Sequence, residues 1–159
     1  MTDLLAHVQL LARYNRLANE ALLDVCQTLS ETTLLEAQGG SFGSILGTLN
    51  HLLIGDRIWL ARFEGSQAAS TGLGKMPYAT LAAFIPEREA TDARIEWLVA
   101  NLEATWLAGT ISYVNNQGRP YEDSRAMLLA HFFNHQTHHR GQIHVLLRQA
   151  GVPSLLLDM

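Results

Sequence analysis

The chain has little cysteine, little positive charge and no long apolar run. Its single cysteine, Cys26, excludes an intramolecular disulfide and a cysteine-rich zinc module, which is typical of a reducing compartment. The 11 Lys and Arg residues are scattered and outnumbered by 15 Asp and Glu, so the net charge of −4 predicts no nucleic-acid partner. No stretch approaches about 18 uninterrupted apolar residues, and no cationic segment precedes an apolar run at the N-terminus. We therefore expect a cytoplasmic protein without a membrane partner, in which Cys26 is a small core residue.

The length of 159 residues fits one domain, residues 1–159, without internal repeats. A chain of this size buries a sizeable core without disulfides or a structural metal. Any bound metal is therefore expected to serve function rather than folding.

Four segments place apolar residues at the spacing of an amphipathic helix. Three of them follow residues suited to cap a helix N-terminus, namely Thr2 or Asp3, Ser41 or Ser44, and Asp123 or Ser124. The predicted helices cover about 3–30, 44–65, 80–107 and 124–150, with a loop over 66–78 and a small hairpin within 111–121. The sequence therefore predicts an all-α four-helix bundle, a fold that builds cofactor sites from side chains on facing helices.

The fourth predicted helix contains four of the seven histidines within nine residues: His131, His135, His138 and His139. Residues four apart on a helix lie one above the other, so either 131/135 or 135/139 is able to share a metal ion. On a helical wheel, His139 falls inside the apolar arc and His135 at its edge, whereas His131 and His138 turn toward solvent. The wheel therefore favours the pair 135/139.

A metal in a bundle needs a further ligand from another helix, and three histidines remain. His144 faces away from the pair on its helix, and His7 lies off the apolar stripe of the first helix. By elimination His51 is the best third nitrogen, although its wheel position is at best the edge of the apolar arc.

Asp56 and Asn15 are polar residues at positions predicted to be buried. An unpaired carboxylate in a core is costly, so Asp56 should be paired, metal-bound or hydrogen-bonded. A structural ion pair, for example with an arginine, is favoured over direct ligation. Asn15, with Asn19 one turn later, would either orient ligands or substrate or cross-link helices.

Three segments together resemble the DinB family, a superfamily of metal-binding four-helix bundles. They are Tyr14-Asn15 with Asn19, then Asn50-His51 followed by Gly55-Asp56-Arg57-Ile58-Trp59-Leu60, and the block from His131 to Gln142. The last block is the most specific, because its two histidines four apart are followed by Arg140-Gly141-Gln142. The resemblance implies a three-histidine metal site at His51, His135 and His139, an antiparallel bundle with crossover connections, and a homodimer.

Some members of this family resemble transferases that use low-molecular-weight thiols. Other members have no assigned activity. Three neutral imidazoles leave coordination positions open, so the leading hypothesis is that the site binds zinc, nickel or iron and activates such a thiol for transfer to a small electrophile. Asp56 or Asn15 would support the ligands, and His131 or His138 would lie at the mouth of the site. The alternatives are a metal-dependent hydrolase, which Gln136 disfavours because a His-Glu-x-x-His protease has its glutamate base there, and a non-catalytic metal-binding stress-response protein.

Overall fold

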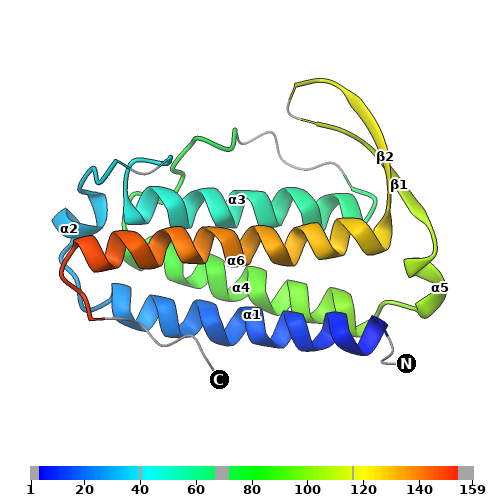
Figure 1. Cartoon of the computed structure of the whole chain (residues 1–159), viewed down its shortest axis with the longest axis horizontal. Helices are drawn as coiled ribbons and strands as arrows, with labels where there is room; N and C mark the ends of the chain where they lie inside the picture. Colours follow the sequence, from blue (N-terminus) through cyan, green and yellow to red (C-terminus); the bar gives the residue numbers. More distant parts are fainter. Residues whose placement is uncertain (1–3, 40, 67–71, 116, 154–159) are drawn as a thin grey trace.

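The structure, a computed structural model, describes residues 4–39, 41–66, 72–115 and 117–153, and it consists mainly of helices (Figure 1). The long helices are α1 (Leu4–Cys26), α3 (Ile45–Phe63), α4 (Leu81–Ala100) and α6 (Arg125–Gln149). Two short helices, α2 (Glu31–Leu35) and α5 (Ala104–Leu107), and a hairpin of β1 (Thr110–Val114) and β2 (Pro120–Ser124) connect them. No helix among the described residues is long and apolar enough to cross a membrane.

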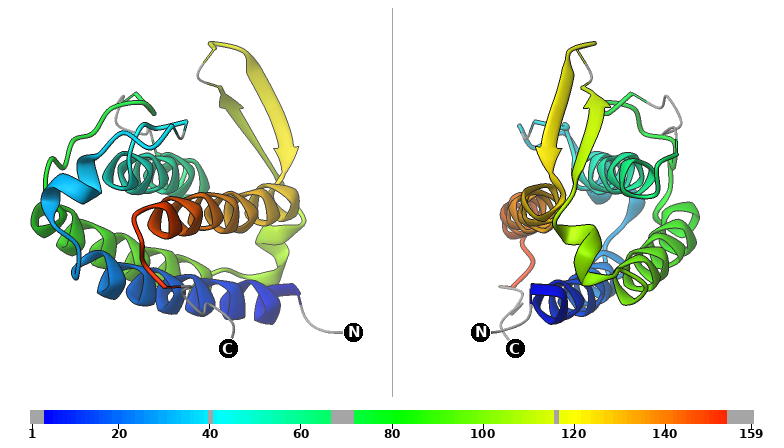
Figure 2. Two further views of the ribbon diagram at one scale, coloured as in Figure 1. Left: turned by 60° about the vertical axis from the view of Figure 1, so that its left-hand side comes forward. Right: turned by 90° about the vertical axis from the view of Figure 1, so that its right-hand side faces the viewer.

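The four long helices pack as a bundle in which α1 contacts α4 and α6, and α3 contacts the same two helices. Helices α1 and α6 run in one direction and α3 and α4 in the other (Figures 1 and 2). The neighbours α3 and α4 are therefore parallel, which requires a crossover connection between them. The expectation of a four-helix bundle with a crossover is confirmed.

Two helix boundaries differ from the prediction. The first helix, predicted to reach about residue 30, ends at Cys26, and Ser30 caps the separate helix α2 because its side chain accepts a hydrogen bond from the Thr33 N–H. The third predicted helix is divided, since α4 ends at Ala100 and α5 begins only at Ala104. Neither short helix has enough turns to show a period of its own in the sequence.

The predicted hairpin is confirmed and leads directly into α6. Strands β1 and β2 are antiparallel, and Gly118 takes a positive φ of 77° in the turn between them. Ser124 ends β2 and also caps α6, since its side chain accepts from the Met127 N–H. Arg125 then donates to the carbonyls of Thr110 and Trp106. These contacts fix the hairpin at one end of α6 (Figure 2).

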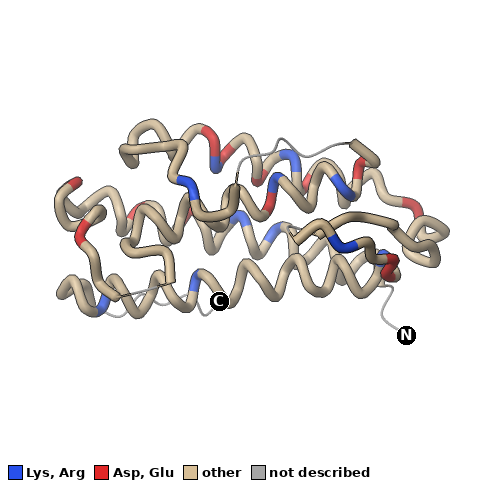
Figure 3. Tube along the Cα trace, turned by 90° about the horizontal axis from the view of Figure 1, so that it is seen from above, with Lys and Arg blue, Asp and Glu red and all other residues tan. Residues whose placement is uncertain are grey.

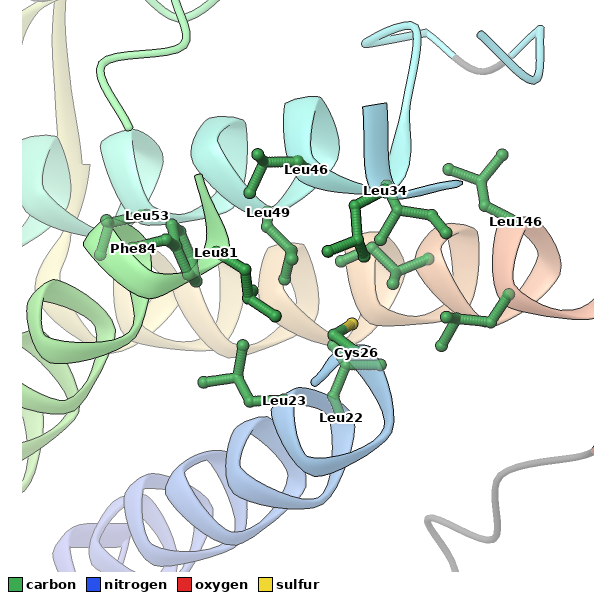
Figure 4. Close-up of a cluster of buried hydrophobic side chains, with 13 residues drawn as sticks. Leu22, Leu23, Cys26, Leu34, Leu46, Leu49, Leu53, Leu81, Phe84 and Leu146 are labelled. Carbon is green, nitrogen blue, oxygen red and sulfur yellow. The ribbon is translucent and has the colours of Figure 1, made fainter. Parts of the chain in front are cut away.

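The bundle interior contains two apolar clusters and a buried polar layer. One cluster surrounds Cys26, which is a core residue as predicted, and includes Leu34 and Phe84 (Figure 4). The other includes Leu60 and Phe132. The polar layer draws residues from all four long helices, and its members are Asn15, Asn19, Asp56, Arg88, Asp92, Gln136 and Arg140.

Lys and Arg are spread over the helices and the hairpin rather than gathered in one segment (Figure 3). Several of them form ion pairs across the bundle, as Arg16 does with Glu96 on α4 and Arg94 with Glu64 at the end of α3.

Candidate metal centre

Helix α6 places His135 and His139 one turn apart, as the predicted spacing required. The rings of His135 and His139 lie with centroids 4.3 Å apart, and the ring of His51 on α3 lies 5.6 Å and 4.6 Å from them. His51 and His139 are buried and His135 is partly buried. The three histidines predicted from the sequence therefore come together. We call His51, His135 and His139 the histidine cluster.

The distances within the cluster fit a single ion. One ring nitrogen from each of the three residues lies within 4.8 Å of the other two. The Nε2 atoms of His135 and His139 are 3.0 Å apart. Two nitrogens that each lie about 2.0–2.1 Å from one tetrahedral ion are about 3.3 Å from each other. The observed pair is thus close to ligand geometry before any ring moves.

Hydrogen bonds at the opposite ring nitrogens orient two of the imidazoles. His51 Nδ1 lies 3.0 Å from the Leu73 carbonyl oxygen, and because a carbonyl only accepts, Nδ1 carries the proton. His139 Nδ1 lies 2.8 Å from Gln142 Oε1 and donates to it in the same way. In both rings the lone pair is therefore on Nε2. Outer hydrogen bonds of this kind are the usual support of metal-ligating histidines.

His135 differs from its two partners. Its Nδ1 is buried and has no hydrogen-bond partner among the described residues. Its ring packs against Gly55 of α3, where a Cβ atom would lie only 2.9 Å from His135 Cε1. Glycine at position 55, one turn after His51, is thus what allows the imidazole to approach α3.

Burial keeps the cluster neutral. Loss of solvation lowers the pKa of His51 and of His139, and it lowers the pKa of His135 to about 3, with the neighbouring histidines adding to the effect. Neutral imidazole is the form that binds a metal, so all three rings have a lone pair to offer at neutral pH.

Phe42 covers one side of the cluster. Its ring stacks on His51 at a centroid distance of 3.6 Å and meets His139 edge-on at 5.5 Å. Phe42 precedes α3 in a turn, so the helical wheel did not include it. This stacking explains why His51 is buried although its wheel position was marginal.

Asp56 and Asn15, proposed as supports of the ligands, have their hydrogen bonds in the polar layer. Asp56 forms the predicted ion pair with an arginine, at 2.5 Å from Arg88, and also accepts from Gln136 at 3.0 Å. Asn15 donates to Asp92 and accepts from Arg140. Neither has a hydrogen bond to the histidine cluster among those of the described residues. The nearby charge of Asp56 nonetheless opposes part of the lowering of the His51 pKa.

The other histidines lie outside the cluster. His131 and His138 are exposed, as the wheel predicted; the His131 ring packs on Trp59 at 5.2 Å, and His138 Nε2 lies 3.1 Å from Gln142 Nε2. His7 is exposed on α1, and His144 is partly exposed near the end of α6.

Four contributors to the site were assigned no role there from the sequence: Phe42, Leu73, Gly55 and Gln142, of which the last two stand in the segments that resemble the DinB family. Gly55 had a detectable signal, because a glycine inside a long apolar helix costs about 1 kcal/mol relative to alanine and thus suggests a close approach. Gln142 also had a detectable signal, because its position three residues after His139 places it on the same helix face. The Leu73 carbonyl had no sequence signal, since every residue has a backbone carbonyl.

The fold and the cluster define a class: a helical bundle with a buried three-histidine site able to hold a metal ion between two facing helices. Within that class, the chain belongs to the DinB family, whose family model matches residues 1–159.

Two relatives illustrate the similarity. Protein DinB of Bacillus subtilis (strain 168) is 28% identical over 153 residues, which cover 93% of this chain and 88% of that protein. The crystal structure of a DinB-like protein from Bacillus cereus ATCC 10987 superposes with a TM-score of 0.63 at 22% identity, over 89% of each chain. At that identity the likeness concerns the fold.

Proposed function

We propose that the histidine cluster holds a divalent transition metal, and that the loaded site activates a low-molecular-weight thiol for transfer to a small electrophile. The observation that carries this proposal is the convergence of Nε2 lone pairs from His51 and His139, whose other ring nitrogens are tied to Leu73 and Gln142. Imidazole suits zinc, nickel and iron. Three protein ligands, unlike the four of a structural zinc site, leave a coordination position for a substrate.

A metal in this site would lower the pKa of a bound thiol or water and so supply a nucleophile at neutral pH. The chain's own residues would shield the site, admit the substrate and transfer the proton. Phe42 shields the cluster on one side, while His135 lines a pocket that admits a small molecule. His131 lines the same pocket and is exposed, so it is placed to take the thiol proton and release it to solvent.

In the proposed transfer the thiol S–H bond breaks and its proton passes to solvent through His131. The sulfur then forms a bond to the electrophilic carbon as the bond to the leaving group breaks, and the leaving group departs with that electron pair. The products are a thioether and the protonated or anionic leaving group, so no oxidant or reductant is needed.

Gln136 supports thiol transfer over metal-assisted hydrolysis. It occupies the position of the glutamate base in a His-Glu-x-x-His protease, and it is fully buried with its amide nitrogen donating to Asp56 at 3.0 Å. An amide in that position has no basic group with which to activate water.

The metal is tested by elemental analysis of protein purified without a histidine tag. We expect about one ion per chain in the wild type and little in His51→Ala. His7→Ala is the matched control because His7 is exposed on α1. Full occupancy in His51→Ala would remove His51 from the site. Loss of the fold together with the metal would indicate a structural ion instead.

The chemistry is tested by supplying the loaded protein with small thiols and a chromogenic aryl chloride and following thioether formation. We expect metal-dependent turnover that His135→Ala abolishes. Metal binding without any effect on thiols would contradict the transfer reaction and favour a non-catalytic metal-binding protein.

A further inference from the structure

A pocket of about 250 Å³ lies beside the histidine cluster, where α3, α6 and the hairpin meet. Gly55 and His135 line one part of it, and Arg62 and Tyr113 line another. Arg62 follows Gly55 by seven residues on the same helix, which is a rise of about 10 Å. A molecule that touches both Arg62 and the cluster is therefore about this long.

Arg62 is held in place by two aromatic rings and one carbonyl. Its guanidinium carbon lies 4.5 Å from the ring centroid of Trp59 and 4.6 Å from that of Tyr113. Its Nη2 donates to the Val114 carbonyl at 3.1 Å. A guanidinium has five N–H donors in a planar fork, so this arrangement fixes its orientation and leaves donors for a ligand.

Arg62 also differs from other arginines of the bundle in its charge environment. Arg57, on the same helix, pairs with Glu87, and Arg94 pairs with Glu64. No carboxylate in the described part of the chain forms an ion pair with Arg62. Partial burial lowers the pKa of Arg62, yet a guanidinium remains charged at neutral pH.

The remaining lining of the pocket carries no opposite charge. Arg62 is the one Lys or Arg among the described lining residues, and none of those residues is Asp or Glu. Trp59 and Tyr113 provide an aromatic wall on which the Arg62 guanidinium packs. A single positive charge in a partly desolvated, largely apolar pocket attracts an anion and discriminates against a cation.

We infer that this pocket binds a small molecule with a carboxylate at one end, which Arg62 holds while the apolar body lies against Trp59 and the other end reaches the histidine cluster. Arg62 is thereby a specificity residue for the substrate. The assignment of the far end to the cluster rests on the proposed function, but capture of the carboxylate by Arg62 does not require a metal. Either the thiol or the electrophile can supply the carboxylate.

The carboxylate site is tested on the metal-free protein with phenylacetate and its neutral counterpart phenylacetamide, with affinities from tryptophan fluorescence and calorimetry. We expect the wild type to bind phenylacetate at least about tenfold more tightly, because a charge-assisted hydrogen bond is lost in the amide. Arg62→Met should remove this preference, and Arg62→Lys should keep part of it because the charge remains. Arg13→Met, which removes an exposed charge from α1, should leave it unchanged.

Equal affinities for the two compounds in the wild type would overturn the inference, as would no binding of phenylacetate at millimolar concentration. A preference that persists in Arg62→Met would overturn it as well. Should that variant fail to fold, the wild type decides the question, because a preference for phenylacetate that does not weaken as the salt concentration is raised would exclude a charge effect.

A second experiment identifies which substrate carries the carboxylate. The cobalt-loaded protein is titrated with mercaptoacetate and with mercaptoacetamide, and thiolate-to-cobalt absorption is recorded. Tighter binding of mercaptoacetate, lost in Arg62→Met, assigns the carboxylate to the thiol. If phenylacetate binding depends on Arg62 while no thiol changes the cobalt spectrum, the carboxylate site stands and the proposed thiol chemistry fails.

Discussion

Helix α6 takes part in two buried polar regions that are built in opposite ways. Gln136 and Arg140 enter the polar layer, where Arg88 pairs with Asp56 and Asp92 and where Asn15 and Asn19 donate to Asp92. Two carboxylates there face two arginines, and the Gln136 amide oxygen is the buried side-chain atom of the layer without a partner among the described residues. The histidine cluster has no charge to balance, and its inner ring nitrogens converge on one another.

This difference separates a structural role from a functional one. In the polar layer hydrogen bonds join α1 to α4 and α6, and α3 to α4 and α6, so the layer specifies how the four helices pack. In the cluster the outer nitrogens of His51 and His139 are tied and the inner ones converge. Nitrogens that are held in position by outer hydrogen bonds and converge on one point are what a metal site requires.

Removal of Arg88 should have the largest effect on stability. Arg88→Met leaves Asp56 and Asp92 buried without their main counter-charge, so we expect the free energy of unfolding to fall by about 3–5 kcal/mol. Urea denaturation measures the change. Arg94→Met is the matched control: it breaks the pair of Arg94 with Glu64, in which the arginine is exposed, and should cost at most about 1 kcal/mol. Similar losses in both variants would contradict a structural role for the layer.

Removal of Gln142 should affect the cluster and spare the fold. Gln142→Leu deletes the acceptor that orients His139, so metal affinity should fall about 10–100-fold. Competition with a chromophoric chelator measures the affinity. Gln149→Leu, at an exposed position of the same helix, should retain wild-type affinity. If Gln142→Leu instead lowered the unfolding free energy by as much as Arg88→Met, the cluster would be structural.

Two glycines of the long helices should respond differently to alanine. In Gly55→Ala the new Cβ would meet His135, so metal affinity should fall about tenfold even though alanine favours a helix by about 1 kcal/mol. At Gly141 on α6 a Cβ atom would meet no described atom within 4 Å beyond its own helix backbone, so Gly141→Ala should raise stability and leave the metal bound. Equal metal affinities in the two variants would show that His135 does not need the space at Gly55.

The long helices and two of the three clustered histidines, His135 and His139, were predictable from the sequence because both depend on the period of an α-helix. His135 and His139 share a helix, so their spacing alone brings them together. His51 was placed by elimination and by the family resemblance, since its burial depends on Phe42, which lies outside the helix. The partner of Asp56 was expected to be an arginine, but which one depends on how α3 and α4 align, and no pattern within either helix encodes that.

The two regions should also make opposite contributions to the pH dependence of stability. His135 has a pKa lowered by burial to about 3, so below about pH 6.5 the unfolded chain takes up a proton that the folded protein does not. Its contribution is complete above that pH and is lost as the pH falls. Asp92 has a pKa raised by burial to about 6, so between about pH 4 and 6 the folded protein holds the extra proton, and stability falls as the pH rises.

Substitution of His135 and substitution of Asp92 should therefore change the slope of unfolding free energy against pH in opposite directions in the metal-free protein. From pH 4 to 6, His135→Gln should reduce the rise of unfolding free energy with pH, and Asp92→Asn should increase it, each by less than about 1.4 kcal/mol per pH unit. Urea midpoints at several pH values measure the slopes, and Gln149→Leu, which removes no titrating group, should reproduce the wild-type curve. Because only the slope is compared, a general loss of stability in Asp92→Asn does not obscure the result. Slope changes of the same sign in both variants would refute the distinction between a neutral histidine cluster and a charge-balanced polar layer.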